Sequence, residues 1–451
     1  MPDDHQASLD YLYGRLNYER LGMPRRGGGD LRLGRMRRLL RRLGDPQDAL
    51  RIVHVAGTKG KGSTAAMLAA CLTASGVRTG LFCSPHLHRL EERFTVDGRA
   101  ATPADLVDLT EAVRPAVATL DAEAGALGRG PTFFEVTAAM GLLHFARRGA
   151  GAVVLEVGLG GRLDSTNAVR PLLAVITTIS LDHTRQLGTT LGAIATEKAG
   201  ILKRGRPAVV GVRGDEARAA IERVARQRLA PLRRIDVDFG YTYRPPMPPI
   251  DRPAAGTVAV RTWRSDWPPI ELPLFGAHQA HNAAVALAAL DALAELGLEA
   301  GPEAVARGFA DLRWPARVEV LGEGPWLVVD GAHNVASAEA LAETLRTCFP
   351  TTPRTLVFGT TREKDLRGQL RALLPLFDAC VATRYVENPR SVEPAEVAAA
   401  VAELGGPEAV VAPDPAAALA LARRLTTADG LVCVTGSLFL AAEARAVALG
   451  G

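Results

Sequence analysis

The sequence contains no long uninterrupted apolar run. A helix that crosses a membrane needs about 20 consecutive apolar residues, and no stretch of this chain approaches that length. The first part of the chain includes Asp3, Asp4 and Asp10 and has no apolar core, so it does not resemble a signal peptide. We therefore expect a cytoplasmic protein that has no membrane partner.

Cysteines and aromatic residues are also scarce. The chain has 5 cysteines, an odd number without a C-x-x-C pair, and most of them lie in apolar segments. This pattern is typical of buried free thiols in a reducing compartment. Aromatic residues make up 5% of the chain and the net charge is only +4, whereas a nucleic-acid surface needs more basic charge interleaved with aromatic rings. We interpret the arginine cluster at 35–42 as a solvated helix face and expect no nucleic-acid partner.

The chain is long, and short apolar runs alternate along it with longer helical patterns. Its 451 residues exceed one ordinary core, so two domains are expected and a third is possible. The first half has helical segments such as 63–75 and 134–147, and strands are predicted at 52–56, 79–83, 152–157 and 173–179. This alternation favours a parallel sheet that is covered by helices on both faces.

The composition changes twice along the chain. Between 231 and 275 prolines are frequent and the apolar runs are short, which predicts antiparallel strands and loops, and an Ala/Leu-rich helix follows at 282–296. After Pro315 the alternation begins again, with a helix at 335–348 and strands at 326–330, 355–359, 379–383 and 431–435. We therefore predict a first domain at 1–312, a hinge at 313–316 and a second domain at 317–451.

The stretch 55–64, VAGTKGKGST, follows a predicted strand and precedes a predicted helix. In this context backbone N–H groups and the helix dipole bind phosphates. The usual phosphate loop has its lysine after the last glycine, whereas Lys61 lies between Gly60 and Gly62. Lys61 can reach terminal phosphates, and Ser63 or Thr64 can hydrogen-bond a phosphate or lie near Mg²⁺. The alternative is a Gly-rich turn with two solvated lysines.

Polar residues also end two further predicted strands. Glu156 ends the strand at 152–157, where a carboxylate projects into the crevice that binds ligands in open α/β sheets. Its hard oxygen atoms suit Mg²⁺, although a helix cap or a paired glutamate is the alternative. His183, in the sequence SLDH, follows the strand at 173–179 and is expected at the same sheet edge. Lys198 by itself indicates no more than a surface lysine.

The second domain contains a similar turn. The sequence DGAHN at 330–334 ends a predicted strand and opens a predicted helix. Its carboxylate and imidazole would face a ligand bound between the domains. The alternative is a structural turn in which the asparagine caps the helix.

Together these motifs resemble the folylpolyglutamate synthase and dihydrofolate synthase group of the Mur ligase superfamily. The resemblance extends from about residue 33 to 440. The similar stretches are HVAGTKGKGST, SPHLHRLEERFTVDG, TFFEVTAAMGLLHF, LEVGLGGRLDSTN, SLDHTRQLGTTLGAIATEKAGI, FGAHQAHNAAVAL, RWPARVEVL, VVDGAHN and VTGSLFL. In this family GT-x-GKGS is the normal phosphate loop.

The resemblance implies an α/β fold with two domains. One is a P-loop-type N-terminal ATPase domain that has a mostly parallel sheet and a small antiparallel β elaboration. The other is a Rossmann-like α/β C-terminal domain, the glutamate-ligase domain, and ATP binds between the two. The segments at 17–20 and 27–30 depart from the family pattern in the region of its folate-binding loop.

The resemblance also implies roles for individual residues. The nucleotide would be bound by Thr58, Gly60, Lys61, Gly62, Ser63, Thr64, Asn282, Arg317 and Asp330. Two Mg²⁺ ions would be held by Ser84, Glu156, His183 and Lys198, the last of which would be carbamylated by CO₂. The substrates would contact Thr132, Phe133, Phe134, Leu163, Asp164, Ser165 and His333. Lys61, His183 and Lys198 would be the catalytic residues.

The implied reaction adds L-glutamate to dihydropteroate, to reduced folates or to both. ATP phosphorylates the substrate carboxylate, and the glutamate amine then attacks the acyl phosphate, which gives ADP and phosphate. A monomer is expected. One alternative is a muramyl-peptide ligase or another Mur-type amino-acid ligase, which the stretch SPHLHRLEERFTVDG counts against. A second alternative is a non-catalytic nucleotide-binding protein.

Overall fold

The computed structural model describes residues 2–21, 33–125, 129–247 and 252–450, which form two compact units. The N-terminal unit comprises Met1–Thr242, Val258–Ile270 and His281–Leu312, and the C-terminal unit comprises Tyr243–Thr257, Glu271–Ala280 and Arg313–Gly451. The ranges predicted from the sequence are continuous, whereas the two segments between 243 and 280 group with the C-terminal unit.

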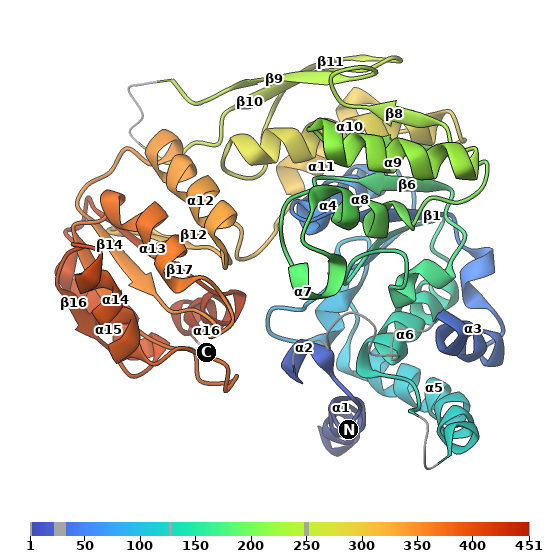
Figure 1. The fold of residues 1–451 in the computed structure, drawn as a ribbon, viewed down its shortest axis with the longest axis horizontal. Coiled ribbons are helices and arrows are strands. Elements are labelled where there is room, and N and C mark those ends of the chain that lie inside the picture. The colour runs from blue at the N-terminus through green and yellow to red at the C-terminus, as the bar shows by residue number, and fades with distance from the viewer. Residues whose placement is uncertain (1, 22–32, 126–128, 248–251, 451) are drawn as a thin grey trace. The chain divides into compact units, whose positions relative to one another are not determined.

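The N-terminal unit is built on an eight-stranded sheet (Figure 1). In spatial order its strands are β4 (Arg99–Ala100), β3 (Phe94–Val96), β2 (Thr79–Phe82), β5 (Ala152–Glu156), β1 (Ile52–Ala56), β6 (Leu173–Ile176), β7 (Ala208–Val210) and β8 (Leu232–Arg234). The six strands from β2 to β8 pair in parallel, while β3 and β4 form an antiparallel edge. Strand β1 is buried along its whole length, as expected for a parallel strand covered on both faces.

The prediction for this sheet was wrong in two places. Residues of β8 lie in the region for which antiparallel strands were predicted, yet β8 pairs in parallel with β7. The strand predicted at 173–179 ends at Ile176, and the following residues hydrogen-bond to the loop after β1 instead.

Helices cover both faces of this sheet. One apolar cluster joins Ile52 and Leu155 to helix residues such as Val136, and a second joins Ile176 to Ala195. The helices are α1 (Pro2–Tyr13), α2 (Tyr18–Leu21), α3 (Leu33–Arg42), α4 (Lys61–Ala74), α5 (Pro103–Ala124), α6 (Phe133–Arg147), α7 (Thr184–Leu187), α8 (Leu191–Ala199) and α9 (Asp215–Arg228), with 3₁₀ turns at Pro46–Ala49, Leu90–Arg93 and Ser165–Ala168.

A separate three-stranded sheet forms the β elaboration that the sequence predicted. Its strands lie in the order β11 (Asp266–Glu271), β10 (Thr257–Arg261) and β9 (Gly240–Arg244). Two helices follow it in the chain, α10 (Ala277–Ala294) and α11 (Pro302–Asp311). Helix α10 carries Asn282.

The C-terminal unit is a second α/β layer structure. Its sheet has the order β12 (Glu319–Gly322), β13 (Trp326–Val329), β17 (Leu431–Thr435), β14 (Arg354–Phe358), β15 (Ala379–Ala382) and β16 (Ala409–Val411). All neighbours pair in parallel except β12, which is antiparallel to β13. Its helices are α12 (Val335–Cys348), α13 (Leu366–Leu373), α14 (Pro394–Glu403), α15 (Pro415–Leu425) and α16 (Leu438–Leu449), with a 3₁₀ turn at Leu374–Leu376.

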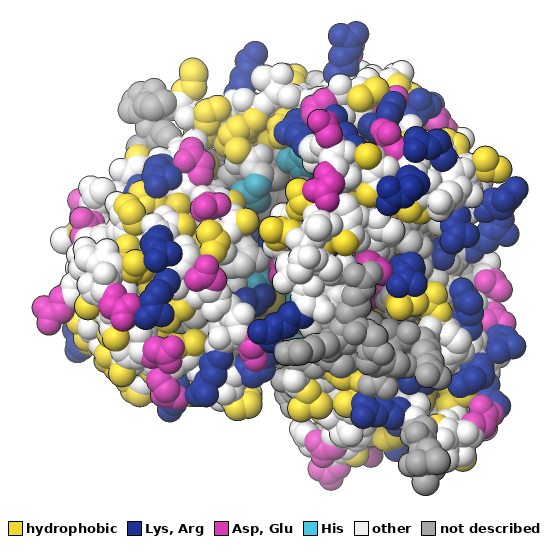
Figure 2. Space-filling view, in the orientation of Figure 1, with side chains coloured by type: hydrophobic (Ala, Val, Ile, Leu, Met, Phe, Trp, Pro, Cys, Tyr) yellow, Lys and Arg dark blue, Asp and Glu magenta, His cyan; other side chains and the backbone are white. Residues whose placement is uncertain are grey.

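Several composition-based predictions can be compared with the structure. All five cysteines are buried and free. Arg35 differs from the predicted solvated face, because it is buried in an ion pair with Glu135 at 2.7 Å. On the face shown in Figure 2, Lys and Arg side chains are interspersed with acidic and uncharged ones. Within the described residues, no helix combines the length and apolarity needed to span a bilayer.

Candidate functional site

The predicted phosphate loop connects β1 to α4. A Cβ atom at Gly57 would lie 1.9 Å from Thr177 Oγ1, and a Cβ at Gly60 would lie 2.1 Å from Asn282 Oδ1. Gly60 also has φ +79°, in the left-handed region. Both positions therefore require glycine, and Asn282 on α10 lies against the loop, while its nucleotide role stays a prediction.

The predicted phosphate-binding residues lie together at this loop. They occupy the loop and the first turn of α4: Thr58, Gly60, Lys61, Gly62, Ser63 and Thr64. The Thr64 hydroxyl is buried and has no hydrogen-bond partner within the described structure. A helix N-terminus that follows a Gly-rich loop is well suited to an anion.

Two threonines after β6 fix the loop, and the sequence analysis missed them. The Thr177 and Thr178 hydroxyls donate to the Lys59 carbonyl at 2.6 and 3.0 Å. The Lys59 backbone N–H donates to Thr178 Oγ1 at 3.0 Å. The Thr58 N–H donates to the Thr178 carbonyl at 2.7 Å. The loop is thus held in one conformation by the neighbouring strand.

Glu156 is the last residue of β5, and Ser84 lies just after the adjacent strand β2. The Ser84 backbone N–H donates to Glu156 Oε2 at 3.3 Å, and Glu156 is only 5% exposed. Within the described ranges no three His, Cys, Asp or Glu side chains cluster as a metal cage. The single Glu156 carboxylate beside Ser84 nevertheless fits Mg²⁺. Proteins usually hold this ion through one or two carboxylates, while phosphates and water supply the remaining ligands.

His183 and Lys198 lie with Lys61 around a small cavity of about 30 Å³. Its lining comprises Gly57, Thr58, Lys61, Gly158, Leu159, Gly160, Asp182, His183, Leu187 and Lys198. His183 immediately precedes α7, and its side chain is 48% exposed. The structure therefore brings the three predicted catalytic residues together, whereas Ser84 and Glu156 are not part of this lining.

Lys198 is buried at the end of α8, which the sequence alone did not indicate. It is 4% exposed, and its Nζ donates to the Gly57 carbonyl at 2.8 Å. Burial, followed by the positive charge of Lys61, lowers the pKa of Lys198 to about 7. A large fraction of this amine is therefore neutral near pH 7, and a neutral amine is a nucleophile.

The predicted substrate residues around α6 differ in their exposure. Thr132 caps α6 and accepts a hydrogen bond from the Glu135 N–H. Phe133 is 1% exposed and stacks on Tyr13 with ring centroids 5.4 Å apart. Phe134 is half-buried, and a Cβ at Gly158 would lie 2.6 Å from its ring. Phe134 is therefore the more accessible phenylalanine, while Thr132 and Phe133 shape the local structure.

Asp164 organises the loop after β5. Its Oδ2 accepts from the Leu159 N–H at 2.8 Å, and its Oδ1 accepts from the Thr166 N–H at 2.9 Å and from the Thr166 hydroxyl. Burial raises the pKa of Asp164. Leu163 and Ser165 are half-buried on either side of it. A substrate contact for these three residues stays a prediction, and Asp164 has a clear structural role.

Arg93 lies at the centre of a buried cluster of side chains. The sequence did not indicate this cluster, because its members are far apart along the chain. Arg93 is fully buried and forms a bidentate ion pair with Glu19, at 3.0 and 2.5 Å. Its Nε donates to His86 Nδ1 at 2.9 Å, and its guanidinium lies 5.1 Å from the Phe133 ring centroid. Glu19 belongs to the divergent segment 17–20, whereas 27–30 lies outside the described residues.

In the C-terminal unit, Asp330 holds a strained segment. Its Oδ2 accepts from the Val318 N–H at 3.0 Å and its Oδ1 from the Ala332 N–H at 2.8 Å. Val318 has φ 49°, which is unusual for a β-branched residue. Burial raises the pKa of Asp330, although Arg317 opposes this effect. The carboxylate predicted to bind nucleotide therefore also supports this backbone.

Arg317 and His333 lie beside the same turn. A Cβ at Gly331 would lie 2.8 Å from Arg317 Nη1, and His333 Nδ1 is 2.9 Å from the Gly331 carbonyl. Asn334 caps α12 through the Ser337 N–H at 3.0 Å. The helix cap that was considered as an alternative is thus present, together with the predicted group of Arg317, Asp330 and His333.

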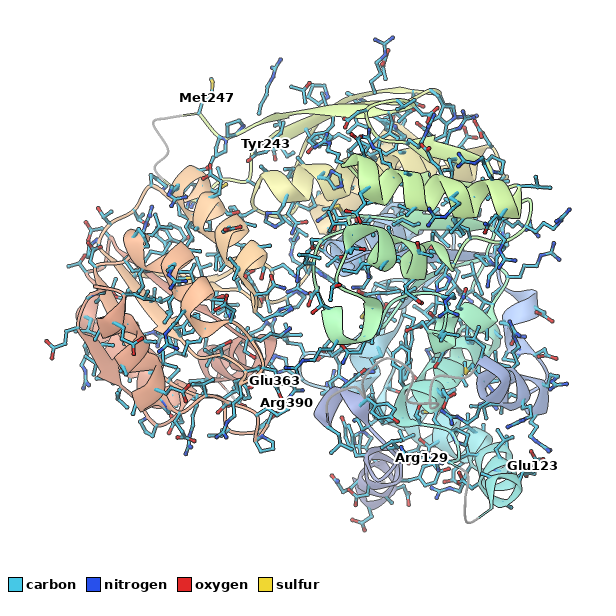
Figure 3. All side chains as sticks on the ribbon, in the orientation of Figure 1. Glu123, Arg129, Tyr243, Met247, Glu363 and Arg390 are labelled. Atoms are coloured by element: carbon cyan, nitrogen blue, oxygen red, sulfur yellow. The ribbon has the colours of Figure 1, made fainter. Side chains whose placement is uncertain are left out.

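A further ion pair joins the turns that follow β14 and β15. Glu363 and Arg390 point toward each other in Figure 3, with Oε2 and Nη2 3.0 Å apart. The Arg362 N–H also donates to the Arg390 carbonyl at 3.0 Å. These turns lie at the carboxyl ends of parallel strands, where α/β sheets bind ligands, and no sequence motif indicated them.

Comparisons with known proteins show similarity to two Mur ligase domains and to folate-related ligases. The Mur ligase middle domain matches residues 55–290, and the domain described as "Mur ligase, glutamate ligase domain" matches residues 316–438. The "Dihydrofolate synthase/folylpolyglutamate synthase" of Mycobacterium tuberculosis is 37% identical over 395 residues, which is 84% of this chain and 80% of that protein. The "Probable bifunctional folylpolyglutamate synthase/dihydropteroate synthase" of Halobacterium salinarum is 40% identical over 416 residues, or 90% of this chain. The chain spans only 48% of the length of that Halobacterium relative.

Solved structures show the same fold. The Mycobacterium tuberculosis folylpolyglutamate synthase complexed with ADP has a TM-score of 0.89 and 33% identity, and the match covers 99% of this chain and 98% of that one. The Escherichia coli FolC in complex with DHPP and ADP has a TM-score of 0.81 and 31% identity, with 97% and 96% of the chains covered.

Proposed function

The chain belongs to the folylpolyglutamate synthase and dihydrofolate synthase family of Mur ligases, and we propose that it uses ATP to join L-glutamate to dihydropteroate, to reduced folates or to both. The observation that carries this proposal is the phosphate loop whose Lys61 shares one small cavity with His183 and Lys198. We further propose that the protein acts as a cytoplasmic monomer.

The proposed reaction has two steps. A carboxylate oxygen of the folate substrate attacks the γ-phosphorus of ATP, and the bond to the leaving ADP oxygen breaks, which gives an acyl phosphate. The glutamate amine then attacks the acyl carbon, loses a proton, and phosphate leaves with the original carboxylate oxygen. Such a phosphoryl transfer depends mainly on positioning and charge neutralisation. The loop glycines provide close backbone approach and Lys61 provides positive charge.

Ser84, Glu156 and His183 would hold Mg²⁺ at this site. When bound, the ion would neutralise charge on the phosphates. Glu156 is suited to this role because it is buried at the end of β5 and offers oxygen atoms. His183 is suited to it because it lies in the cavity lining beside Lys61.

Lys198 would react with CO₂ to form a carbamate. The neutral amine attacks the carbon of CO₂, a nitrogen–carbon bond forms, one C=O electron pair moves to oxygen, and a proton is released. The product is an anion at a position where the free amine is neutral or cationic, and it could support a second Mg²⁺. The pKa of about 7 favours this reaction, because a large fraction of the amine is already neutral near pH 7.

The C-terminal unit would contribute Arg317 and Asp330 to the nucleotide and His333 to glutamate. This assignment is supported by the family match over 316–438 and by the grouping of the three residues at one turn. Phe134, Leu163 and Ser165 would contact the pterin side of the substrate, since each is accessible in part.

An ADP-release assay tests the proposal. The purified protein would be given ATP and Mg²⁺ with dihydropteroate and glutamate, with tetrahydrofolate and glutamate, or with a muramyl peptide and its amino acid. We expect ADP formation with at least one folate substrate, dependent on glutamate, and none with the muramyl peptide. Nucleotide binding without ADP formation in any mixture would instead support a non-catalytic protein.

A further inference from the structure

Lys59 and Asp182 are two charged residues at the phosphate loop. The proposed reaction assigns no role to either of them. Lys59 lies within the loop, and Asp182 lies in the turn that leads from β6 to α7. Lys59 Nζ is 3.1 Å from Asp182 Oδ2, and the two side chains are 29% and 14% exposed. The pair is therefore shielded in part from solvent, unlike most surface ion pairs.

The other carboxylate oxygen of Asp182 contacts His183. Asp182 Oδ1 accepts a hydrogen bond from the His183 backbone N–H at 2.9 Å, and His183 Nε2 lies 3.9 Å from the same oxygen. His183 has φ 48°, in the left-handed region that residues with side chains rarely adopt. One carboxylate thus links the loop cation to the backbone of a strained histidine.

The Lys59 backbone is itself fixed. Its N–H donates to the Thr178 hydroxyl, and its carbonyl accepts from the Thr177 and Thr178 hydroxyls. Because three hydrogen bonds fix the position of Lys59, its ion pair with Asp182 ties the His183 turn to the loop, in addition to the hydrogen bonds between Thr58 and Ser180.

We propose that Lys59 and Asp182 are positioning residues that hold His183 beside the phosphate loop for the joint binding of Mg²⁺ and nucleotide. This inference rests on the proposed function, since there His183 is a Mg²⁺ ligand. Lys59 acts through Asp182 and does not itself bind the phosphates.

The test measures ADP affinity with and without Mg²⁺ by isothermal titration calorimetry on the full chain. The measured quantity is the ADP dissociation constant without Mg²⁺ divided by the ADP dissociation constant with Mg²⁺. This ratio reports how strongly Mg²⁺ tightens ADP binding. In Asp182→Ala and Lys59→Met we expect this ratio to fall by about five-fold or more. In Asp182→Asn, which keeps an acceptor for the His183 N–H, the ratio should fall less. In Lys59→Arg, which keeps the ion pair, the ratio should equal that of the wild type.

A matched control breaks an ion pair elsewhere in the same unit. Arg234 Nη1 and Glu222 Oε1 are 2.9 Å apart, near the β8 edge of the sheet. Glu222→Ala should leave the ratio unchanged. If Asp182→Ala does not fold, Lys59→Met and Lys59→Arg decide the question, because they leave the backbone hydrogen bonds in place.

Three results would overturn the inference. The first is a wild-type ratio in both Lys59→Met and Asp182→Ala. The second is a wild-type chain in which Mg²⁺ does not tighten ADP binding. The third is a loss of Mg²⁺-free ADP affinity in Lys59→Met with a gain in Asp182→Ala, which would show that Lys59 binds phosphate directly. Failure of the proposed function would appear separately, as wild-type protein that binds Mg²⁺ and ADP but ligates no folate.

Discussion

Asp182 in the N-terminal unit and Asp330 in the C-terminal unit each hold a non-glycine residue in the left-handed region. Asp182 holds His183 at φ 48°, and Asp330 holds Val318 at φ 49°. They differ in their second partner, because Asp182 pairs with the Lys59 ammonium whereas Asp330 accepts another backbone N–H. The first arrangement places charged side chains around a cavity, and the second fixes a backbone. We therefore expect changes at the first to alter chemistry, and changes at the second to alter stability in addition to the nucleotide contact proposed for Asp330.

Among the substitutions near the cavity, Lys61→Ala should lower the rate of ligation the most. Removing the ammonium from the phosphate loop should lower the rate of ATP-dependent ligation by about 100- to 1,000-fold. The melting temperature should change little, because Lys61 lies at the start of α4 in a cavity lining and not in a hydrophobic core. Kinetics and calorimetry on the same sample provide the test. Unchanged turnover in a folded variant would refute the loop assignment.

Gly60→Ala should be the next largest change. The new Cβ would lie 2.1 Å from Asn282 Oδ1, so the Asn282 side chain, the loop or α10 must move, and a displacement of about 1 Å can lower activity about 100-fold. Gly205→Ala is the matched control, since Gly205 has φ +66° and no atom within 4 Å of its Cβ position. The control should lose stability through backbone strain and keep its kcat. Equal activity losses in both variants would show that strain alone explains the effect.

Asp330→Ala tests the structural side of the comparison. Two buried backbone N–H groups, of Val318 and Ala332, would lose their acceptor, which should destabilise the C-terminal unit by about 2–4 kcal/mol. Asp414→Ala removes a cap that accepts one N–H at the start of α15 and should cost about 1 kcal/mol. Denaturant unfolding would measure both. A smaller loss for Asp330 than for Asp414 would contradict the structural role.

Lys198→Met should have a smaller, pH-dependent effect on stability. The folded pKa of Lys198 is lowered to about 7 from 10.5, so between these values the unfolded chain binds the additional proton. Stability of the wild type therefore rises with pH across this window. The methionine variant should be more stable than the wild type near pH 6, and this advantage should shrink as the pH rises toward 10. Melting temperatures of both proteins across this range, in CO₂-free buffer, provide the measurement. A constant difference would contradict the lowered pKa.

Much of the fold could be predicted because apolar runs mark buried parallel strands. Strands β1 and β17 have the predicted bounds, since each is a short, mostly apolar run that is followed by a glycine. Strand β8, with the sequence LRR, carries two arginines and has no apolar pattern, so only its pairing with β7 reveals it. The edge strands β3 and β4 are too short to show a periodicity.

The residues of the candidate site also fall into two groups, those that the sequence predicted and those that only the folded chain reveals. Lys61 and His183 were predicted from local patterns and Lys198 from the family resemblance, and the fold brings all three to one cavity. The hydrogen bonds from Thr177 and Thr178 to the phosphate loop depend on pairing between β1 and β6, which a local sequence pattern cannot show. The Arg93–Glu19 pair joins residues 74 positions apart, and it too required the folded chain.

The central claim is that a substrate carboxylate is phosphorylated at the phosphate loop. The most direct measurement uses folate substrate labelled with ¹⁸O in the reacting carboxylate, together with ATP and L-glutamate, and analyses the released phosphate by mass spectrometry. The proposed mechanism predicts one ¹⁸O atom in each phosphate formed by ligation, because the carboxylate oxygen leaves with the phosphoryl group. Ligation that yields unlabelled phosphate would contradict it.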